Sequence, residues 1–123
     1  MKRSSGLFLF LFSLAIIPTI SLSARATELR CGWLDNPTPA NWWLVDRDGT
    51  WIIGMQGGYQ ADGMENLPFL DEENYVRTNG YYGYGCACLD VTTDPVDQRI
   101  LVIEDGEALP LNVCTTDPSL PPR

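Results

Sequence analysis

The side chains that could carry out chemistry in this sequence are almost all carboxylates. After residue 26 the chain contains sixteen Asp and Glu residues, no histidine, no lysine and a single serine, Ser119. Nucleophilic catalysis by serine or cysteine with histidine, lysine Schiff bases and histidine-bound zinc therefore lack their residues. The arrangement that remains is a pair of carboxylates flanking a glycosidic bond.

Several acidic residues are candidates for such a pair, but their spacing selects no facing couple. They are Asp35, Asp62, Glu65, Asp71, Glu72 and Glu73. Because a carboxylate pair acts only in a defined geometry, we predict no catalytic residue and no cofactor. We expect a protein that is not an enzyme, with a carboxylate-based glycoside hydrolase as the third hypothesis.

Two acidic clusters are candidates for calcium binding. Residues 46–49, Asp-Arg-Asp-Gly, begin like a calcium loop, but the glycine stands at position four instead of six, and position twelve is Gly57 instead of a bidentate Glu. We therefore predict a hairpin turn. Asp71, Glu72 and Glu73 are predicted to form a solvated loop and no metal site is assigned, with a weak calcium site at this trio as the alternative.

Aromatic side chains are the main positive signal for binding, since ten Trp, Tyr and Phe residues follow residue 26. Trp42 and Trp43 point to opposite faces if they lie on a strand, so one of them is predicted in the core together with Trp51 and Tyr75. Exposed aromatics suit sugar stacking or anchoring of a protein partner. The possible binding surface comprises Tyr81, Tyr82, Tyr84, Trp33, Trp42, Trp43, Asp71, Glu72 and Glu73.

The elements that must position these residues are predicted to be short strands. Glycine and proline recur every eight to fifteen residues, without internal repeats or helical periodicity, which is typical of an all-β domain. We predict a small antiparallel β-sheet, sandwich or open barrel of about five to seven short strands. Strands are expected at residues 41–45, 50–53, 74–78, 86–92 and 99–104, an extended piece at 109–114, a long loop at 62–71, and turns at 46–49, 79–80, 94–95 and 105–106.

The four cysteines, Cys31, Cys86, Cys88 and Cys114, are predicted to form two disulfides. A bond between Cys86 and Cys88 would close a strained ring, and on a strand the two side chains lie side by side on one face. We therefore expect Cys31 and Cys114 each to bond one member of this pair, with both assignments open. Each bond should stabilise the domain by about 3 to 4 kcal/mol.

Residues 1–26 have the layout of a cleaved secretory signal peptide. A basic start precedes an apolar run of 14 residues from Leu7 to Ile20, and residues 24–26 (Ala-Arg-Ala) suit a signal peptidase. The run is shorter than the roughly 20 residues of a spanning helix. We predict cleavage before Thr27, no membrane insertion afterwards, a periplasmic or secreted location, a domain at 27–116 and a frayed, proline-rich tail at 117–123.

Cleavage would make the protein more acidic. Loss of Lys2, Arg3 and Arg25 leaves five arginines against sixteen carboxylates, a net charge of −11. This charge disfavours nucleic acid and favours cationic partners. We expect a monomer that binds a basic protein outside the cytoplasm, as an inhibitor or envelope accessory factor. The alternative is a glycan-binding module that uses Tyr81, Tyr82, Tyr84 and an exposed Trp.

A set of short motifs runs through nearly all of the chain after the predicted cleavage point. The motifs are Arg30-Cys31-Gly32-Trp33-Leu34, Asn36-Pro37-Thr38-Pro39, Asn41-Trp42-Trp43-Leu44, Asp46-Arg47-Asp48-Gly49-Thr50-Trp51, Gln56-Gly57-Gly58, Asn79-Gly80, Tyr82-Gly83-Tyr84, Cys86-Ala87-Cys88-Leu89, Arg99-Ile100-Leu101 and Leu109-Pro110-Leu111 through Cys114. Together they resemble the exported bacterial family named domain of unknown function 4087. The resemblance implies a bacterial source, a periplasmic or secreted location and a single domain, and it implies no activity.

Overall fold

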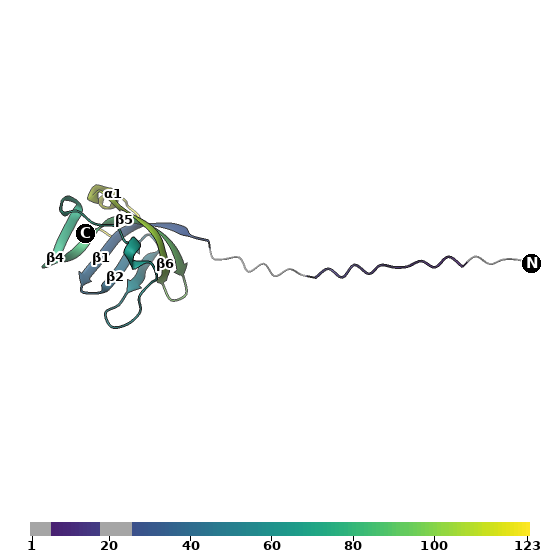
Figure 1. The fold of residues 1–123 in the computed structure, drawn as a ribbon. Coiled ribbons are helices and arrows are strands. Elements are labelled where there is room, and N and C mark those ends of the chain that lie inside the picture. The colour runs from purple at the N-terminus through teal and green to yellow at the C-terminus, as the bar shows by residue number, and fades with distance from the viewer. Residues whose placement is uncertain (1–5, 18–25) are drawn as a thin grey trace, which may run out of the picture.

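The computed structural model describes residues 6–17 and 26–123 (Figure 1). The predicted signal peptide falls partly on residues 1–5 and 18–25, which lie outside the described residues, as do the first two residues of its cleavage motif. Residues 6–17 form no helix or strand, and their large apolar side chains are 80 to 93 % exposed. No helix in the described part of the chain is long and apolar enough to cross a membrane.

The rest of the chain is a β-domain with one short α-helix. Its elements in chain order are β1 (Glu28–Thr38), β2 (Asn41–Asp46), β3 (Gly49–Gly54), the 3-10 turns η1 (Met64–Asn66) and η2 (Glu72–Asn74), β4 (Tyr75–Asn79), β5 (Tyr82–Asp94), β6 (Arg99–Leu109) and α1 (Leu111–Thr115).

Five of these strands close into a barrel. The sheet order is β1-β2-β3-β6-β5-β4, and β1 also pairs with β5, which joins the two ends of the ring. All pairings are antiparallel except the short contact of β3 with β6, where the Ile52 amide donates to the carbonyl of Gln98 at 2.9 Å. The strand β4 pairs with β5 outside the ring. The predicted all-β class is confirmed, in the form of a five-stranded Greek-key barrel, an architecture that includes the OB-fold.

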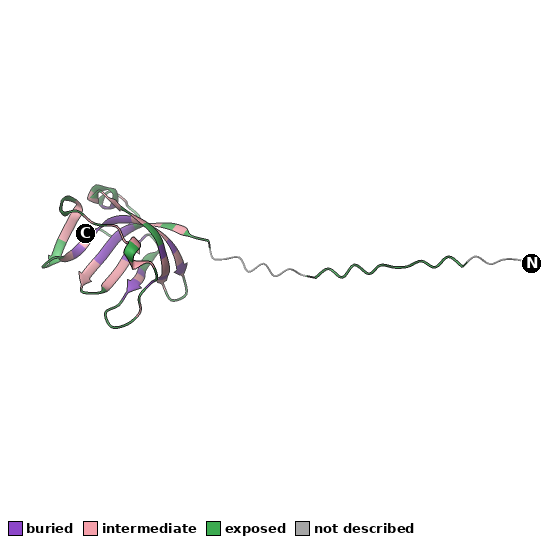
Figure 2. Ribbon diagram, in the orientation of Figure 1, coloured by how far each residue is buried: buried purple, intermediate pink, exposed green. Residues whose placement is uncertain are grey.

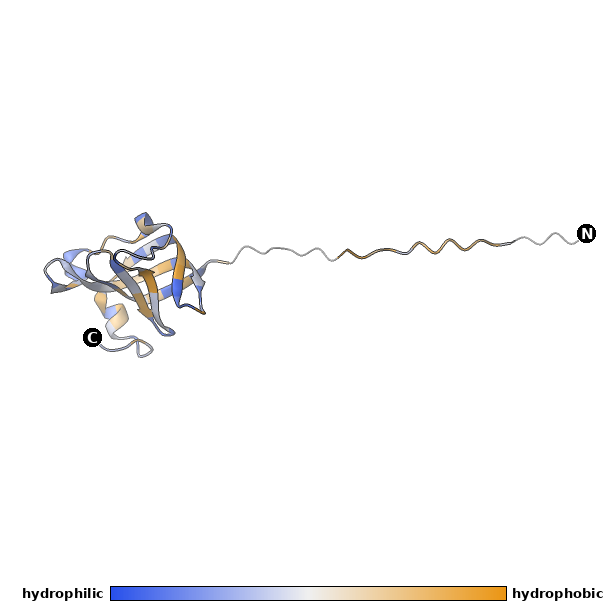
Figure 3. Cartoon of the chain, turned by 90° about the horizontal axis from the view of Figure 1, so that it is seen from below, coloured by the Kyte–Doolittle hydropathy of each residue, from blue (hydrophilic) through white to orange (hydrophobic). Residues whose placement is uncertain are grey.

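The barrel interior is filled by alternate residues of its strands, because successive side chains of a strand point to opposite faces. On β5, Ala87, Leu89 and Val91 are buried in the main core. Figure 2 shows the buried positions along the barrel strands, and Figure 3 shows the apolar stretches on the same strands. The other buried members of this core are Leu34, Leu44, Trp51, Ile53, Ala61, Ile100 and Ile103.

The loop between β3 and β4 packs its apolar side chains against this core. Met64, Leu67 and Leu70 contact the core residues, and the Asn66 side chain donates to the Ile103 carbonyl at 2.8 Å. A Cβ atom placed on Gly106 would lie 2.7 Å from the Asn66 carbonyl oxygen and from Pro68. Glycine is therefore required where the loop crosses β6.

This contact corrects the prediction of a turn at residues 105–106. The strand β6 runs through both positions, with Asp105 beside Asp90 and Gly106 beside Leu89. The glycine serves close approach of the loop and does not reverse the chain. The predicted extended piece at 109–114 is also wrong, since residues 111–115 form α1.

The outer face of β1 and β5 carries a second, smaller core. Trp33, Cys86, Cys114 and Leu120 are its buried members, and α1 and the carboxyl-terminal residues cover them. The prediction that residues 117–123 are frayed is therefore wrong: Leu120 is 8 % exposed and Asp35 binds Arg123 through two hydrogen bonds. Of the aromatics predicted to be buried, Trp51 is in the main core, whereas Tyr75 is half-buried.

Two disulfides attach both ends of the domain to β5. They join Cys31 to Cys88 and Cys86 to Cys114, and the described residues contain no free cysteine. The prediction that Cys31 and Cys114 each bond one member of the central pair is confirmed. Cys31 lies on the exposed surface, whereas Cys86 and Cys114 are buried in the smaller core.

Removal of the two disulfides should have different consequences. The pair Cys31→Ala and Cys88→Ala opens a bond that spans 57 residues and should lower the free energy of unfolding by about 4 kcal/mol. The pair Cys86→Ala and Cys114→Ala opens one that spans 28 residues, which corresponds to about 3.5 kcal/mol.

Hydrogen exchange separates these two variants, because only the second bond holds α1 against β5. Exchange at residues 111–123 should rise strongly in the Cys86/Cys114 variant and little in the Cys31/Cys88 variant, after correction for global stability measured by urea unfolding. Equal exchange in both variants would contradict the assigned role of the inner bond.

Candidate functional site

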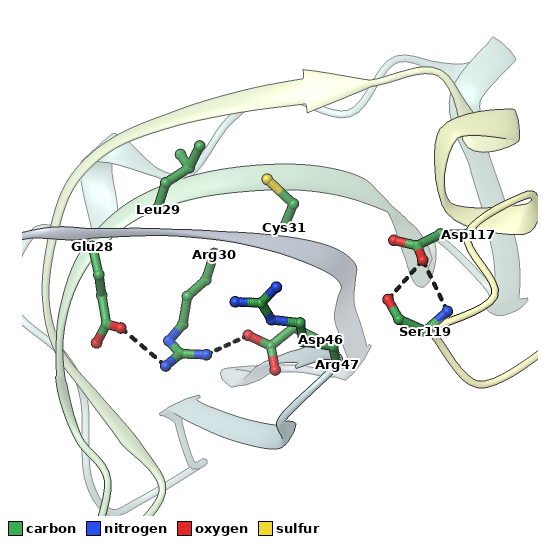
Figure 4. A pocket seen from close by; sticks show the side chains of 8 residues that line it. All are labelled: Glu28, Leu29, Arg30, Cys31, Asp46, Arg47, Asp117 and Ser119. Carbon is green, nitrogen blue, oxygen red and sulfur yellow. Dashed lines mark hydrogen bonds and ion pairs between the residues drawn. The ribbon is translucent and has the colours of Figure 1, made fainter.

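A pocket lies beside Arg30, among the charged groups around the start of β1 (Figure 4). Its volume is about 260 Å³, slightly below the range of about 300 to 1,000 Å³ typical of small-molecule sites. The residues that line it are Glu28, Leu29, Arg30, Cys31, Asp46, Arg47, Asp117 and Ser119.

Arg30 is held by three carboxylates and one aromatic ring. Its guanidinium donates to Asp46 at 2.7 Å, to Asp48 at 2.9 Å and to Glu28 at 2.9 Å, and its carbon atom lies 4.0 Å from the centre of the Trp51 ring. Its buried Nε atom has no hydrogen-bond partner in the described part of the chain. Burial lowers the pKa of Arg30, but the hydrogen bonds that it donates to Asp46 and Asp48 and the negative charges of Asp46 and Glu28 raise that pKa above its ordinary value, so the guanidinium stays charged.

Asp46 connects this charge cluster to the core. Its carboxylate accepts hydrogen bonds from the Trp51 indole at 3.0 Å and from the Asp48 amide at 2.8 Å, and its side chain is only 3 % exposed. Asp46 ends β2 and Asp48 lies in the hairpin turn between β2 and β3, and the predicted turn is confirmed. Arg30 contacts one oxygen of each of these carboxylates, which ties the turn to β1.

Elsewhere the pocket offers little recognition chemistry. Hydrogen bonds from the Ser119 hydroxyl and amide lower the pKa of Asp117, which is on the surface. Over residues 6–17 and 26–123, no group of three His, Cys, Asp or Glu side chains is arranged to hold a metal ion. The pocket thus lies between the start of β1, the turn after β2 and the carboxyl-terminal tail.

A second, smaller pocket of about 150 Å³ lies by the loop that follows β3. Tyr59 lines it and donates its hydroxyl to the Ile100 carbonyl at 2.6 Å. Burial raises the pKa of Tyr59, and the Arg99 guanidinium lies 4.8 Å from its ring centre. These contacts fix the loop against β6 and leave no free polar group of Tyr59 to face a ligand.

The aromatic residues predicted to form a binding surface differ widely in their exposure. Trp33 is 1 % exposed and lies in the smaller core, where Tyr84 packs edge-on against it with ring centres 5.4 Å apart. Trp42 packs partly against the main core. Trp33 is therefore part of the smaller core, where carboxyl-terminal residues cover it.

The remaining predicted aromatics have partial or full exposure. Trp43 and Tyr82 are half-buried on β2 and β5. Tyr81 is 82 % exposed at the turn between β4 and β5, and Arg77 lies over its ring at 4.9 Å. Among the described residues, Tyr81 is thus the one predicted aromatic of this surface with an exposed ring.

The acidic residues Asp71, Glu72 and Glu73 belong to a larger group that follows β6. The loop of residues 62–74 runs beside this strand: Asp62 bridges to Val102, and Asn74 accepts from the Leu111 amide at 3.3 Å. Both the loop and β6 beside it carry exposed carboxylates. This acidic band consists of Asp62, Glu65, Asp71, Glu72, Glu73, Glu104, Asp105 and Glu107.

Arginines are nearly absent from the acidic band. Within the described residues, its one ion pair joins Glu72 to Arg77 at 2.5 Å. Arg30, Arg47 and Arg123 are instead paired with Asp or Glu residues outside the band. The negative charge of the domain is thus concentrated along β6 and its accompanying loop.

Phe69 is the residue of this region that sequence analysis missed. It is 88 % exposed although its neighbours are fixed: Leu70 packs against the main core, and Pro68 lies against Gly106. The sequence signal that could have identified Phe69 is its position inside a long loop, just before the acidic trio. The loop thus holds an apolar ring outward between Glu65 and the acidic trio.

Barrel, disulfides and acidic band together define a small disulfide-bonded β-domain built for an oxidising, extracellular environment. The chain belongs to the family described as "Protein of unknown function (DUF4087)", whose model matches residues 25–121. This match confirms the resemblance seen in the sequence motifs. No curated protein and no solved structure matches the chain.

Substitution of Asp46 should destabilise the protein far more than substitution of its exposed neighbour. Asp46→Ala leaves the buried Arg30 guanidinium without its closest partner and the Trp51 indole without an acceptor, and should cost about 3 to 5 kcal/mol in the free energy of unfolding. Asp48→Ala, at a half-exposed carboxylate of the same cluster, should cost about 1 kcal/mol or less. Urea unfolding measures both, and equal losses would refute the structural role of Asp46.

Proposed function

We propose that the protein is exported and that its amino-terminal segment is removed. The apolar side chains of residues 6–17 are exposed and bury nothing in the domain, and β1 begins at Glu28, two residues after the predicted cleavage point. The two disulfides also need an oxidising compartment to persist.

Export gives a direct expectation for the mass of the protein. When the full chain is expressed in a bacterium, the purified product should begin at Thr27 and weigh four hydrogens less than its sequence predicts, because both disulfides are closed. Mass spectrometry of the intact protein measures both properties. An uncleaved product with free thiols would contradict export.

We further propose that the protein is a non-catalytic binding module for a basic protein partner outside the cytoplasm. The single observation that carries this proposal is Phe69, an exposed apolar ring held in a fixed loop that also carries carboxylates of the acidic band. Interfaces draw most of their affinity from a few buried aromatic or arginine anchors. Charged residues around such an anchor mainly speed and orient association with an oppositely charged surface.

The fixed backbone around Phe69 favours this role. A loop that is already ordered loses little conformational entropy when it binds, and Leu67 and Leu70 hold this loop from the inside. The expected partner therefore carries an apolar pocket with a rim of Lys and Arg. Whether this protein acts as an inhibitor or as an accessory factor depends on which pocket of the partner the Phe69 ring enters.

Glycan binding is the alternative function, and the structure offers it fewer contacts. Stacking on sugar rings needs accessible aromatic faces. Tyr84 is covered by Arg123, whose guanidinium carbon lies 4.8 Å from its ring centre, and Tyr81 is covered on one face by Arg77. A carboxylate-based hydrolase also gains no support from Asp35, whose two oxygens are both occupied by Arg123.

The proposal is tested by the affinity of the purified protein for a partner captured from envelope extracts at low salt. The dissociation constant should rise about tenfold or more between 50 and 500 mM NaCl, since exposed charges are screened. Phe69→Ala should weaken binding about thirtyfold at both salt concentrations, as expected for an anchor worth about 2 kcal/mol.

Two variants provide matched comparisons. Val96→Ala removes an equally exposed apolar side chain, 88 % accessible in the turn between β5 and β6, and should leave the affinity unchanged. Replacing Glu65, Glu73, Glu104 and Glu107 by Gln should reduce the salt dependence. Binding that is insensitive to salt and to Phe69→Ala, or that is competed by soluble sugars, would overturn the proposal.

A further inference from the structure

The last four residues of the chain are held against the outer face of the barrel in the manner of a bound peptide. Residues 121–123 belong to no helix or strand. Their contacts are made instead with side chains: the Trp33 indole donates to the Pro121 carbonyl at 3.0 Å, and Leu120 is buried in the smaller core beside Trp33. The segment has the sequence Leu-Pro-Pro-Arg.

The arginine of this segment contacts groups of complementary chemistry. Its two terminal nitrogens donate to the two oxygens of Asp35 at 2.5 and 2.8 Å, and Asp35 is only 6 % exposed. The guanidinium carbon lies 4.8 Å from the ring centre of Tyr84 and 5.6 Å from that of Trp33. A bidentate carboxylate with two aromatic rings selects arginine over lysine, because only the planar guanidinium matches both.

The residues that hold the arginine lie on rigid elements. Trp33 and Asp35 are on β1 and Tyr84 is on β5, where Asp35 and Tyr84 are directly paired. The Cys31–Cys88 disulfide fixes the same two strands a few residues away. We name Trp33, Asp35 and Tyr84 the arginine cradle. Its geometry depends on paired strands and not on the tail itself, so it should persist when the tail is removed.

We propose that the arginine cradle is a recognition site for proline-rich segments that carry an arginine three residues after an apolar residue, and that the chain's own residues 120–123 occupy it in the absence of a partner. Proline-rich segments are extended before they bind, which lowers the entropic cost of recognition by an aromatic groove. The ligand is a segment of a basic partner protein. The arginine cradle does not include Phe69, so the test of the cradle does not depend on the role proposed for Phe69.

Self-occupation has a quantitative consequence. A tethered segment competes at an effective concentration of about a millimolar, so the complete protein should bind a free peptide weakly. The probe is the fluorescein-labelled, carboxyl-amidated peptide Ser-Leu-Pro-Pro-Arg, whose binding is followed by fluorescence anisotropy. A variant that ends at Ser119 should bind it saturably and at least tenfold more tightly than the complete protein.

The arginine is expected to decide recognition. The peptide with Lys in place of Arg should bind the shortened variant several-fold more weakly, and the peptide with Ala should not bind. Asp35→Asn in the shortened variant should abolish binding of the original peptide, whereas Asp97→Asn, which removes an equal charge from an exposed turn, should not.

A second variant keeps the test decisive if the shortened chain fails to fold. Arg123→Ala leaves Leu120 and the prolines in place but frees Asp35, and it should also bind the peptide more tightly than the complete protein does. Folding is checked by closure of both disulfides and by circular dichroism. A folded variant with a vacated cradle that shows no saturable binding at millimolar peptide, or equal binding of the Arg and Ala peptides, would overturn the proposal.

Discussion

The structure depends on β1 having two neighbours at once. Its nine residues from Glu28 to Asn36 pair with β5, and its second half also pairs with β2, which closes the sheet into a ring. A closed ring has no free edge within it, and its interior can be filled by a core of ten buried residues. The Cys31–Cys88 bond lies across this closing seam. Opening the seam would expose the core, the charge cluster of Arg30 and the arginine cradle together.

Each face of β1 serves a different part of the molecule. On the inner face, Arg30 closes the barrel end over Trp51, and Leu34 enters the core. On the outer face, Cys31, Trp33 and Asp35 hold the disulfide, the smaller core and the tail. The strand therefore has no free side that could vary independently of the fold. Phe69 and the acidic band, in contrast, lie on a loop and on β6, where surface residues can change with little effect on the barrel.

Local features of the fold were predictable from the sequence, and features set by distant contacts were not. The hairpin of β2 and β3 follows from an Asp-Gly turn between β-favouring runs, and the shared face of Cys86 and Cys88 follows from strand geometry. The role of Gly106 depends on a loop that crosses it from 40 positions earlier at Asn66, so the same residue looked like a turn. Arg123 is ordered by Asp35, 88 residues away, and no local pattern signals such a contact. Phe69 was overlooked for a related reason. Only the packing of Leu67 and Leu70 against the core shows that the loop is fixed and that the Phe69 ring stays outside.

The disulfide pattern also constrains how the protein can be made. Numbered along the chain, the first cysteine bonds the third and the second bonds the fourth. In the export proposed above, with the amino terminus crossing first, an oxidase that joins cysteines in order of emergence would bond Cys31 to Cys86, which is a non-native pair. The native bonds therefore require either pairing of β1 with β5 before oxidation or later exchange through a mixed disulfide. Only Ala87 separates the two possible partners of Cys31. The bond to Cys88 is native, whereas a bond to Cys86 would first have to be exchanged.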